Sequence, residues 1–414
     1  MRTRTRALAV LMSAAAAVAA LPAVAVAAPA PAPVAYAAVA DGRSLTFLNA
    51  PERLLTGEDT DRDMIYRGSL DPGSHRIVFE HGNYGATAFT YGLLLQNVSS
   101  CDLSVRVERK GYGTFPGAGV NAARPVADML NGAGGEAARS LPAGTSAWLF
   151  TATAPAGAFF TGALDLTTTR VAAGCAGGAV FLKAGVFTAL PTPAAAAALP
   201  YRGADNGNGQ YNDRKVYNGR VTVPYAVDRP TNEVATQDLS WTLDAGTTVG
   251  STLPVTYRGQ TRDRWTTHAT PSRKAQAVGT DMLSVWMPLR ADSFALTEIN
   301  PFEIDPRNTD GTTGNLANWG VVETSTGTIR NTTGTDRTVT FVVRQGDTGG
   351  NVRFALRCTA TGAWTAVDFP AGAPQDTRSC QIPVPAGQAA RFTVSTILGG
   401  PSIGVLEHAL TVTA

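Results

Sequence analysis

The residues that could carry chemistry in this 414-residue chain are a few acids, histidines and tryptophans. The densest acidic group near aromatic residues is Glu298, Glu303 and Asp305, and a hydrolase with paired carboxylates needs only two acids facing each other across a cleft. The four histidines are scattered, and the sequence contains no HExxH, GxSxG, CxxC or glycine-rich phosphate loop. We therefore predict a protein that is not an enzyme and that needs no cofactor or metal.

The tryptophans suggest binding instead of catalysis. Sugar-binding sandwiches stack exposed aromatic faces against pyranose rings, and tryptophan offers a large apolar face with a polar edge. The candidate ligand surface consists of Trp241, Trp265, Trp286 and Trp319. The alternative is that these side chains fill a core, because burying a tryptophan removes a large apolar area from water.

An acidic loop places Asp59, Asp61 and Asp63 at alternate positions, as at the start of a calcium-binding loop. The similarity ends there, because Met64 stands where such a loop needs glycine and Leu70 where it needs glutamate. A solvated turn is the favoured interpretation over a calcium site.

Four cysteines are divided equally between the two halves of the sequence. If the protein is exported, pairing within each half matches two independently folded domains, so we predict the disulfides Cys101–Cys175 and Cys358–Cys380. Free buried thiols are the alternative. A metal site is disfavoured because no histidine lies near any of the cysteines.

The N-terminus combines three early arginines, an apolar run and small-residue steps, which is typical of a secretory signal peptide. We predict a signal peptide over residues 1–28 and a flexible Ala/Pro spacer over residues 29–40, and hence a secreted or extracellular protein. A membrane anchor is the alternative for the apolar run. No later stretch is long and apolar enough to span a membrane, so we predict no membrane span after the signal is removed.

Composition indicates a globular protein. The chain is 44% hydrophobic and 16% charged with a net charge of +2, and its length is sufficient for two cores. It has no basic stripe of the kind that binds phosphate backbones, so a nucleic-acid partner is not expected.

The elements that would position any site follow from an internal duplication. The stretch Asn83–Gly111 returns as Asn318–Gly346, with offsets of about 235 at the start and 234 from Asn97 to Asn331. Each copy predicts a strand, a hairpin turn and a second strand with period-2 alternation, which buries one face. We therefore predict an all-β protein of two β-sandwich domains, jelly-roll or Ig-like, with a partly duplicated core hairpin.

The turns of the two copies, NVSSCD and NTTGTD, contain asparagine and aspartate that can hydrogen-bond the backbone ahead of them. Both also contain an N-x-[ST] sequon, and we favour the turn role over glycosylation. The stretch LPTPAAAAALP, residues 190–200, predicts a linker between domains at 41–189 and 201–414. Residues Val221–Asn315 have no clear counterpart in the first half, so any function is expected chiefly there.

Several pieces of the sequence together resemble an uncharacterised family of exported bacterial proteins, known mainly from cyanobacteria and described as a domain of unknown function. The matching pieces are MIYRGSLDPGSHRIVFEH, TYGLLLQNVSSCDLSVRV, LPAGTSAWLF, KVYNGRVTVPY, NLANWGVVETSTGTIRNTTGTDRTVTFVV and VPAGQAARFTV. The four cysteines and the alanine-rich linker depart from that family, and no catalytic residues carry over from it.

We therefore predict a secreted, non-enzymatic structural or binding protein of the cell envelope or extracellular matrix. Its expected partner is an envelope polysaccharide or another surface protein. The alternative is an extracellular protein that binds or processes carbohydrate through the segment from Trp241 to Glu303.

Overall fold

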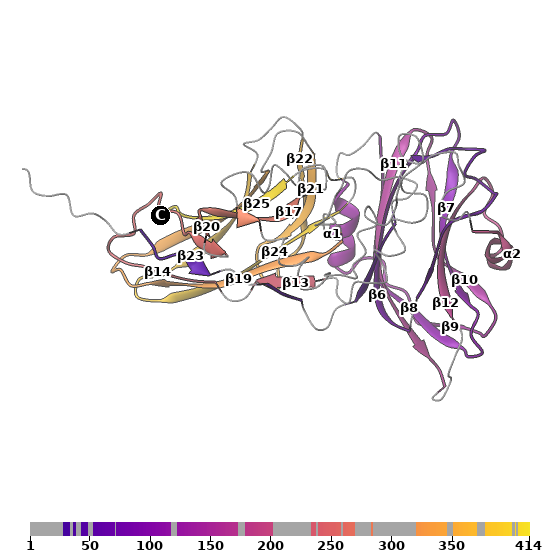
Figure 1. Ribbon diagram of the computed structural model, residues 1–414, viewed down its shortest axis with the longest axis horizontal. Helices are drawn as coiled ribbons and strands as arrows, with labels where there is room; N and C mark the ends of the chain where they lie inside the picture. Colours follow the sequence, from indigo (N-terminus) through magenta and orange to yellow (C-terminus); the bar gives the residue numbers. More distant parts are fainter. Residues whose placement is uncertain are drawn as a thin grey trace, which may run out of the picture.

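The computed structural model describes residues 28–201 and 233–414, with gaps. The stretches outside the description are 1–27, 34–35, 39–42, 49–52, 71, 117–121, 173–178, 202–232, 237–238, 258–259, 270–282, 285–319, 346–350, 371–376, 400–401 and 403–404. The described chain forms two β-sandwiches side by side with one helix, α1 (Arg124–Leu130), between them (Figure 1). The prediction of an all-β protein with two sandwiches is confirmed. Among the described residues no helix is suited to crossing a bilayer.

Two facing sheets form the first sandwich. One sheet has the strand order β10 (Ser146–Ala154), β7 (Phe89–Asn97), β12 (Val180–Phe187) and β5 (Met64–Ser69). The other has the order β3 (Ser44–Leu48), β6 (Gly73–Asn83), β11 (Ala158–Arg170), β8 (Leu103–Pro116) and β9 (Arg139–Leu141), and β4 (Arg53–Leu54) pairs with β6.

The core of the first sandwich follows from the patterns read in the sequence. In β8 the predicted alternation is confirmed, because Leu103, Val105 and Val107 are buried while the residues between them reach the surface. The rings of Phe79 and Tyr91 stack at 4.9 Å in the middle of this core, surrounded by further aromatic rings. An aromatic cluster of this kind removes a large apolar area from water.

The second sandwich also has two facing sheets. One has the order β2 (Tyr36–Ala38), β13 (Glu233–Thr236), β19 (Val322–Asn331), β24 (Ala389–Leu398), β21 (Val352–Arg357) and β22 (Thr365–Phe369), and β14 (Leu239–Leu243) pairs with β19. The other has the order β18 (Leu283–Ser284), β17 (Arg264–Ala269), β25 (Val405–Val412), β20 (Arg337–Gln345) and β23 (Thr377–Val384). A small third sheet joins β1 (Ala32–Pro33), β15 (Val255–Tyr257) and β16 (Gln260–Arg262).

The duplication extends further in the structure than in the sequence. Strands β6, β11, β8 and β9 of the first half lie in the same sheet order as β17, β25, β20 and β23 of the second half, and β7 pairs with β10 as β19 pairs with β24. The registers agree at the turn end of both hairpins: Ser146 lies opposite Gln96 as Ala389 lies opposite Arg330, and Leu141 opposite Leu103 as Val384 opposite Arg337. Strand β17 therefore gives part of Val221–Asn315 a counterpart in the first half.

The turn asparagines hold the same network in both halves. Asn97 is fully buried, and its Nδ2 donates to the carbonyl oxygens of Cys101 (2.7 Å) and Leu141 (3.1 Å), while its Oδ1 accepts from Ser99 N (3.1 Å) and Oγ (2.5 Å). This side chain is therefore part of the turn, as predicted, and a glycan has no access to its amide nitrogen.

Asn331 repeats these contacts at the second turn. Its Nδ2 donates to the carbonyl oxygens of Thr335 (2.8 Å) and Val384 (3.0 Å), and its Oδ1 accepts from Thr333 N (3.0 Å) and Oγ1 (2.7 Å). The serine or threonine of each sequon thus serves the fold of the turn, since an asparagine side chain can satisfy backbone groups that the hairpin leaves unpaired.

The predicted spacer at residues 29–40 differs from expectation, because it contains β1 and β2, which both belong to the second sandwich. Strand β1 pairs in parallel with β15, and β2 pairs antiparallel with β13. In Figure 1 indigo N-terminal segments accordingly lie among the orange and yellow strands. The first sandwich is thus inserted between strands β2 and β13 of the second. Local sequence patterns do not predict this arrangement, because the paired strands are far apart in the sequence.

The predicted linker contains a short helix, α2 (Pro193–Ala198), that packs on the first sandwich. Thr192 caps it, since its Oγ1 accepts from Ala195 N (3.3 Å), and Ala196 is buried against Leu94 and Phe187. Tertiary packing therefore stabilises an alanine run that is too short to be helical by itself.

Helix α1 fills the space between the sandwiches. Its buried residues Val126, Ala127 and Met129 lie in one apolar cluster with side chains of both halves, including Val78 and Ile397. This cluster makes the interface between the halves apolar at its centre, which stabilises their association.

Two further contacts position α1 against the second half. At the end of the helix the side chain of Asn131 bonds to the backbone of Trp364, accepting from its N (2.8 Å) and donating to its O (3.0 Å). A Cβ at Gly399 would lie 2.7 Å from Cγ2 of Val126, so a larger residue there would push the helix away.

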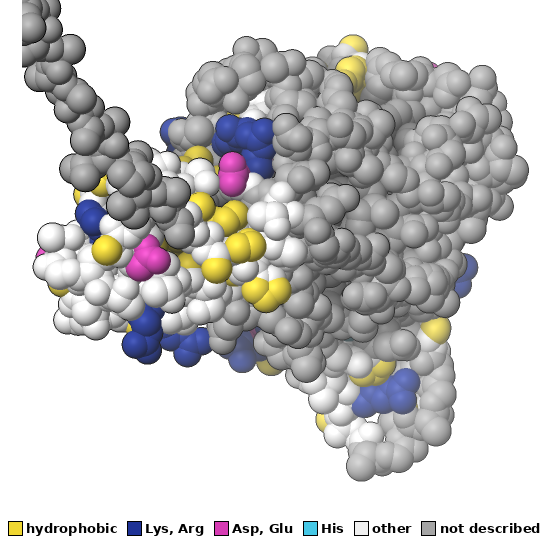
Figure 2. Space-filling view, turned by 60° about the vertical axis from the view of Figure 1, so that its left-hand side comes forward, with side chains coloured by type: hydrophobic (Ala, Val, Ile, Leu, Met, Phe, Trp, Pro, Cys, Tyr) yellow, Lys and Arg dark blue, Asp and Glu magenta, His cyan; other side chains and the backbone are white. Residues whose placement is uncertain are grey.

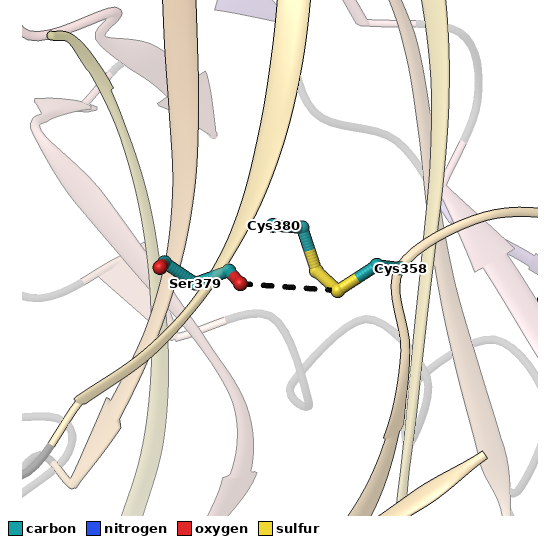
Figure 3. The surroundings of a disulfide bond; sticks show 3 residues. All are labelled: Cys358, Ser379 and Cys380. Carbon is teal, nitrogen blue, oxygen red and sulfur yellow. Dashed lines mark hydrogen bonds between the residues drawn. A yellow bond between two sulfur atoms is a disulfide. The ribbon is translucent and has the colours of Figure 1, made fainter. Parts of the chain in front are cut away.

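One predicted disulfide is present in the second half. Cys358 follows β21 and Cys380 lies in β23, so the bond joins the two sheets of the sandwich, with Ser379 O 3.9 Å from the Cys358 sulfur (Figure 3). Cys101 is also disulfide-bonded, and its predicted partner Cys175 lies outside the described residues. The pairing Cys358–Cys380 is confirmed, and the pairing of Cys101 stays a prediction.

Candidate functional site

The candidate tryptophan surface is not formed by the residues that the structure describes. Trp241 is 2% exposed and Trp265 is fully buried, and both lie in the core of the second sandwich. The indole nitrogen of Trp241 donates to Pro254 O (2.8 Å), and Trp265 stacks on His408 with ring centroids 5.6 Å apart. The prediction that these two present a ligand surface is wrong, because the sandwich needs their apolar area inside.

The other candidate site residues either lie outside the described residues or form hydrogen bonds that stabilise the fold. Trp286, Trp319 and the acidic group of Glu298, Glu303 and Asp305 lie outside the described residues. In the acidic loop, the Asp59 carboxylate is fully buried and accepts from Leu55 N (2.7 Å), and Asp61 accepts from Thr188 N (3.1 Å). Among the described residues no group of three or more histidine, cysteine, aspartate or glutamate side chains could hold a metal ion.

A different polar cluster lies on the outer face of the first sandwich. Asp165 of β11 is fully buried and is held by two arginines of the neighbouring strands: Arg76 of β6 forms a bidentate pair (2.9 and 3.0 Å), and Arg109 of β8 donates at 2.6 Å. Arg43 approaches the same carboxylate at 3.5 Å. Bidentate pairing of arginine with a carboxylate fixes both geometry and charge.

Charge, more than burial, sets the ionisation of this aspartate. Burial raises the pKa of Asp165, but the attraction and hydrogen bond of Arg76, followed by the attraction of Arg109 and Arg43, outweigh it. The pKa therefore lies below its ordinary value, and the carboxylate stays charged under neutral conditions. Three guanidinium groups around one carboxylate leave the cluster with excess positive charge.

The second half contains a reduced copy of this cluster. Glu407 of β25 is 1% exposed, and Arg344 of β20 donates to it at 2.6 Å while Arg264 of β17 lies 3.7 Å away. Arg344 lies opposite Glu407 in the sheet as Arg109 lies opposite Asp165, and the two arginines differ by the duplication offset of 235. The acid between arginines is thus part of the duplicated framework and does not by itself make a binding site.

The first half has a groove next to its cluster. The groove, about 370 Å³ in volume, lies between β8 and the backbone of residues 135–138. Its lining consists of Arg106, Glu108, Gly135, Glu136, Ala137 and Ala138. It is shallow, its lining combines charged side chains with glycine and alanine, and among the described residues that line it none is aromatic.

The groove wall is a segment that binds the edge of β8 through its backbone. Lys110 N donates to Ala133 O (2.8 Å), and Glu136 N donates to Val107 O (2.8 Å). Gly135 is required for this close approach, because a Cβ there would lie 2.6 Å from Glu108 O. The segment therefore lies directly against the edge of β8 and forms the wall of the groove.

The charged groups of the groove differ in how they are held. Glu108 is fixed between Arg43 NH2 (2.7 Å) and the Thr167 hydroxyl (2.6 Å), and Glu136 pairs with Lys110. Arg106 is exposed, and within the described part of the chain no acid pairs with it. The groove is thus lined by one available guanidinium, that of Arg106, and by two carboxylates that are already positioned.

The surface of the second half looks different. On the end that comes forward in Figure 2, the described side chains are mixed, with hydrophobic groups beside single basic and acidic ones. Among the described atoms of this view, those of the backbone and of uncharged polar side chains are the most numerous.

The sequence contains only part of the information that would identify the groove. Arg109 and Arg344 stand at matching positions of the duplicated hairpins and mark the framework. Arg106, Glu108 and the wall residues have no such matching position, and the wall belongs to an insertion between β8 and β9.

Comparisons with known proteins add no family. No family model matches the chain, and no curated protein matches it. Among solved structures, the N-terminal CBM22-1-CBM22-2 tandem domain from Paenibacillus barcinonensis Xyn10C is 10% identical, covers 86% of this chain and 99% of its own, and has a TM-score of 0.12. Vicilin from Corylus avellana (hazelnut) is 11% identical, with coverage of 83% and 75% and a TM-score of 0.11.

Proposed function

We propose that this is a secreted, non-enzymatic binding protein of the cell envelope or extracellular matrix, and that it holds an envelope polysaccharide in the groove beside β8. The observation that carries the proposal is that the exposed Arg106 lines the same groove as the positioned carboxylates of Glu108 and Glu136. Arginine and carboxylate groups together supply donors and acceptors for the hydroxyl groups of a sugar chain.

The shape of the groove supports a polymer as the ligand. A shallow surface groove encloses little of a small molecule, whereas a polymer can lie along it and gain affinity from several weak contacts. Export is supported by the signal-like N-terminus and by the disulfide Cys358–Cys380, which is typical of oxidising compartments.

A carbohydrate-processing role is the second candidate, because two carboxylates line the same groove. A glycoside hydrolase needs one of its two acids to donate a proton. Glu108 already accepts hydrogen bonds from Arg43 and Thr167, and Glu136 is paired with Lys110. This arrangement suits holding a ligand better than donating a proton to one.

Polysaccharide pull-down and a glycan array with the mature protein test the proposal. We expect retention on at least one polysaccharide and its loss, by about tenfold or more, in Arg106→Ala, since a charge-assisted contact contributes roughly 1.5–3 kcal/mol. Arg330→Ala is the matched control, because Arg330 is an exposed strand arginine of the second half.

Two outcomes would reject the proposal. One is no retention on any polysaccharide, and the other is equal retention of the Arg106 and Arg330 variants. Release of reducing sugar by the wild-type protein, lost in Glu108→Gln, would favour the processing role instead.

A further inference from the structure

The N-terminal strands β1 and β2 are an unusual part of the second sandwich, because the whole first sandwich separates them from its other strands in the sequence. Strand β1 has two residues and β2 has three, and they pair with β15 and β13 more than 190 residues later in the sequence. The next strand in the sequence, β3, already belongs to the first sandwich. The other strands of the second sandwich are therefore distant from β1 and β2 along the chain.

The segment contributes a buried side chain to the core of the second sandwich. Ala32 is 1% exposed and lies in the same apolar cluster as Trp241 and Val255. Its backbone N donates to Pro254 O (3.0 Å), which also accepts from the Trp241 indole. The slot is therefore shaped to take an extended strand with a small side chain at this position.

The two strands of this segment are short, with two residues in β1 and three in β2. Two very short strands give few backbone hydrogen bonds, and terminal elements with few contacts open at a small fraction of the global unfolding free energy. Opening exposes the slot and frees a strand that fits it, without disturbing the first sandwich.

We propose that strands β1 and β2 are exchangeable, and that the slot beside β13 and β15 accepts these two strands from a second copy of the chain. The exchanged and closed forms make identical contacts, so exchange costs only the entropy of association. Strand donation into a sheet is an established way for one chain to bind another. The exchanged form increases with protein concentration.

Cysteine trapping at one register pair tests the proposal. Ala37 lies opposite Ala235 in the antiparallel pair of β2 and β13, and opposed antiparallel residues have Cα atoms about 4.5–5.5 Å apart, within disulfide range. Ala37→Cys and Ala235→Cys are made as two single variants, one isotope-labelled, and mixed at high concentration in a thiol redox buffer. The double variant in one chain is the control.

We expect the double variant to close within one chain, and the mixture to form a covalent pair of twice the monomer mass that joins position 37 of one copy to position 235 of the other. Closure of the double variant with no pair in the mixture would overturn the exchange. Failure of the double variant to close would overturn the placement of the segment, and the proposal with it. If either variant does not fold, Ala38→Cys with Val234→Cys, the adjacent register pair, gives the same readout.

Discussion

The two halves of this protein have the same framework but different interiors and surroundings. Both share the sheet order, the hairpin register, the turn asparagine and the acid between arginines. They differ inside, because β7 buries the aromatic side chains of Phe89 and Tyr91 whereas β19 buries the polar side chains of Glu323 and Ser325. The duplicated parts are those that define a sandwich, so binding is to be sought in the insertions.

The insertion between the hairpin and its partner strand is the main external difference. In the first half this insertion contains α1 and the groove wall, and in the second half it contains β21 and β22. Helix α1 makes the interface between the halves, and the wall makes the groove. The same point of the framework thus carries the helix at the interface and the groove wall in the first half, and the additional strands β21 and β22 in the second.

The strongest way to separate the halves is to remove the central acid of each. Asp165→Asn leaves three arginines around an uncharged amide, and we expect a loss of about 3–5 kcal/mol in the free energy of unfolding. Glu407→Gln should cost only about 1 kcal/mol, because its arginines are a third exposed and water screens them. Urea unfolding of both variants provides the measurement, and equal losses would contradict this interpretation.

The same aspartate predicts an acid dependence. Its pKa is lower in the folded protein than in the unfolded chain, so its contribution is complete above the unfolded value of about 4 and is lost as the pH falls through the folded value. The stability difference between wild type and Asp165→Asn should therefore shrink at acid pH. A difference that stays constant from pH 7 to pH 2 would argue against a charged Asp165.

Removing the second-half disulfide should cost slightly less than removing Asp165. The bond Cys358–Cys380 closes a loop with a sequence separation of 22, which corresponds to about 3 kcal/mol on the chain-entropy view. Cys358→Ser with Cys380→Ser should lower the stability of the second half while hydrogen exchange in β7 and β8 stays unchanged. Faster exchange in the first half as well would show that the halves unfold as one unit.

The smallest expected effect concerns the polar interior of the second half. Glu323 is 2% exposed, and burial raises its pKa well above the ordinary value. The folded state therefore keeps a proton that the unfolded state releases, and stability falls as the pH rises above the unfolded value of about 4.3. Glu323→Gln should stabilise the protein at pH 8 and change nothing at pH 3. A variant that is equally or less stable at pH 8 would refute a protonated Glu323.

The sequence was sufficient to predict the fold because strands with one buried face leave a period-2 pattern. The alternation of Leu103, Val105 and Val107 and the offset between Asn97 and Asn331 led to two related sandwiches, and both features are present in the structure. The strand β17 could not be matched to β6 in the same way, since sheet position is kept there without sequence similarity.

Local sequence patterns do not identify the N-terminal strands, and the reason is physical. An Ala/Pro stretch reads as a spacer because its small side chains show no buried face, yet Ala32 fits a slot whose walls lie more than 200 residues away. The tryptophans were wrongly predicted to be exposed for the opposite reason. A large aromatic side chain such as that of Trp241 or Trp265 can bind a ligand at the surface or fill a core, and the sequence does not distinguish the two.

Hydrogen exchange of the mature protein with and without a retained polysaccharide tests most directly whether binding resides in the unshared insertion of the first half. We expect protection of residues 133–138 and of β8 around Arg106, with the matching strand β20 unchanged. Protection confined to the second half, with no change along the groove, would contradict the assignment of binding to the first half.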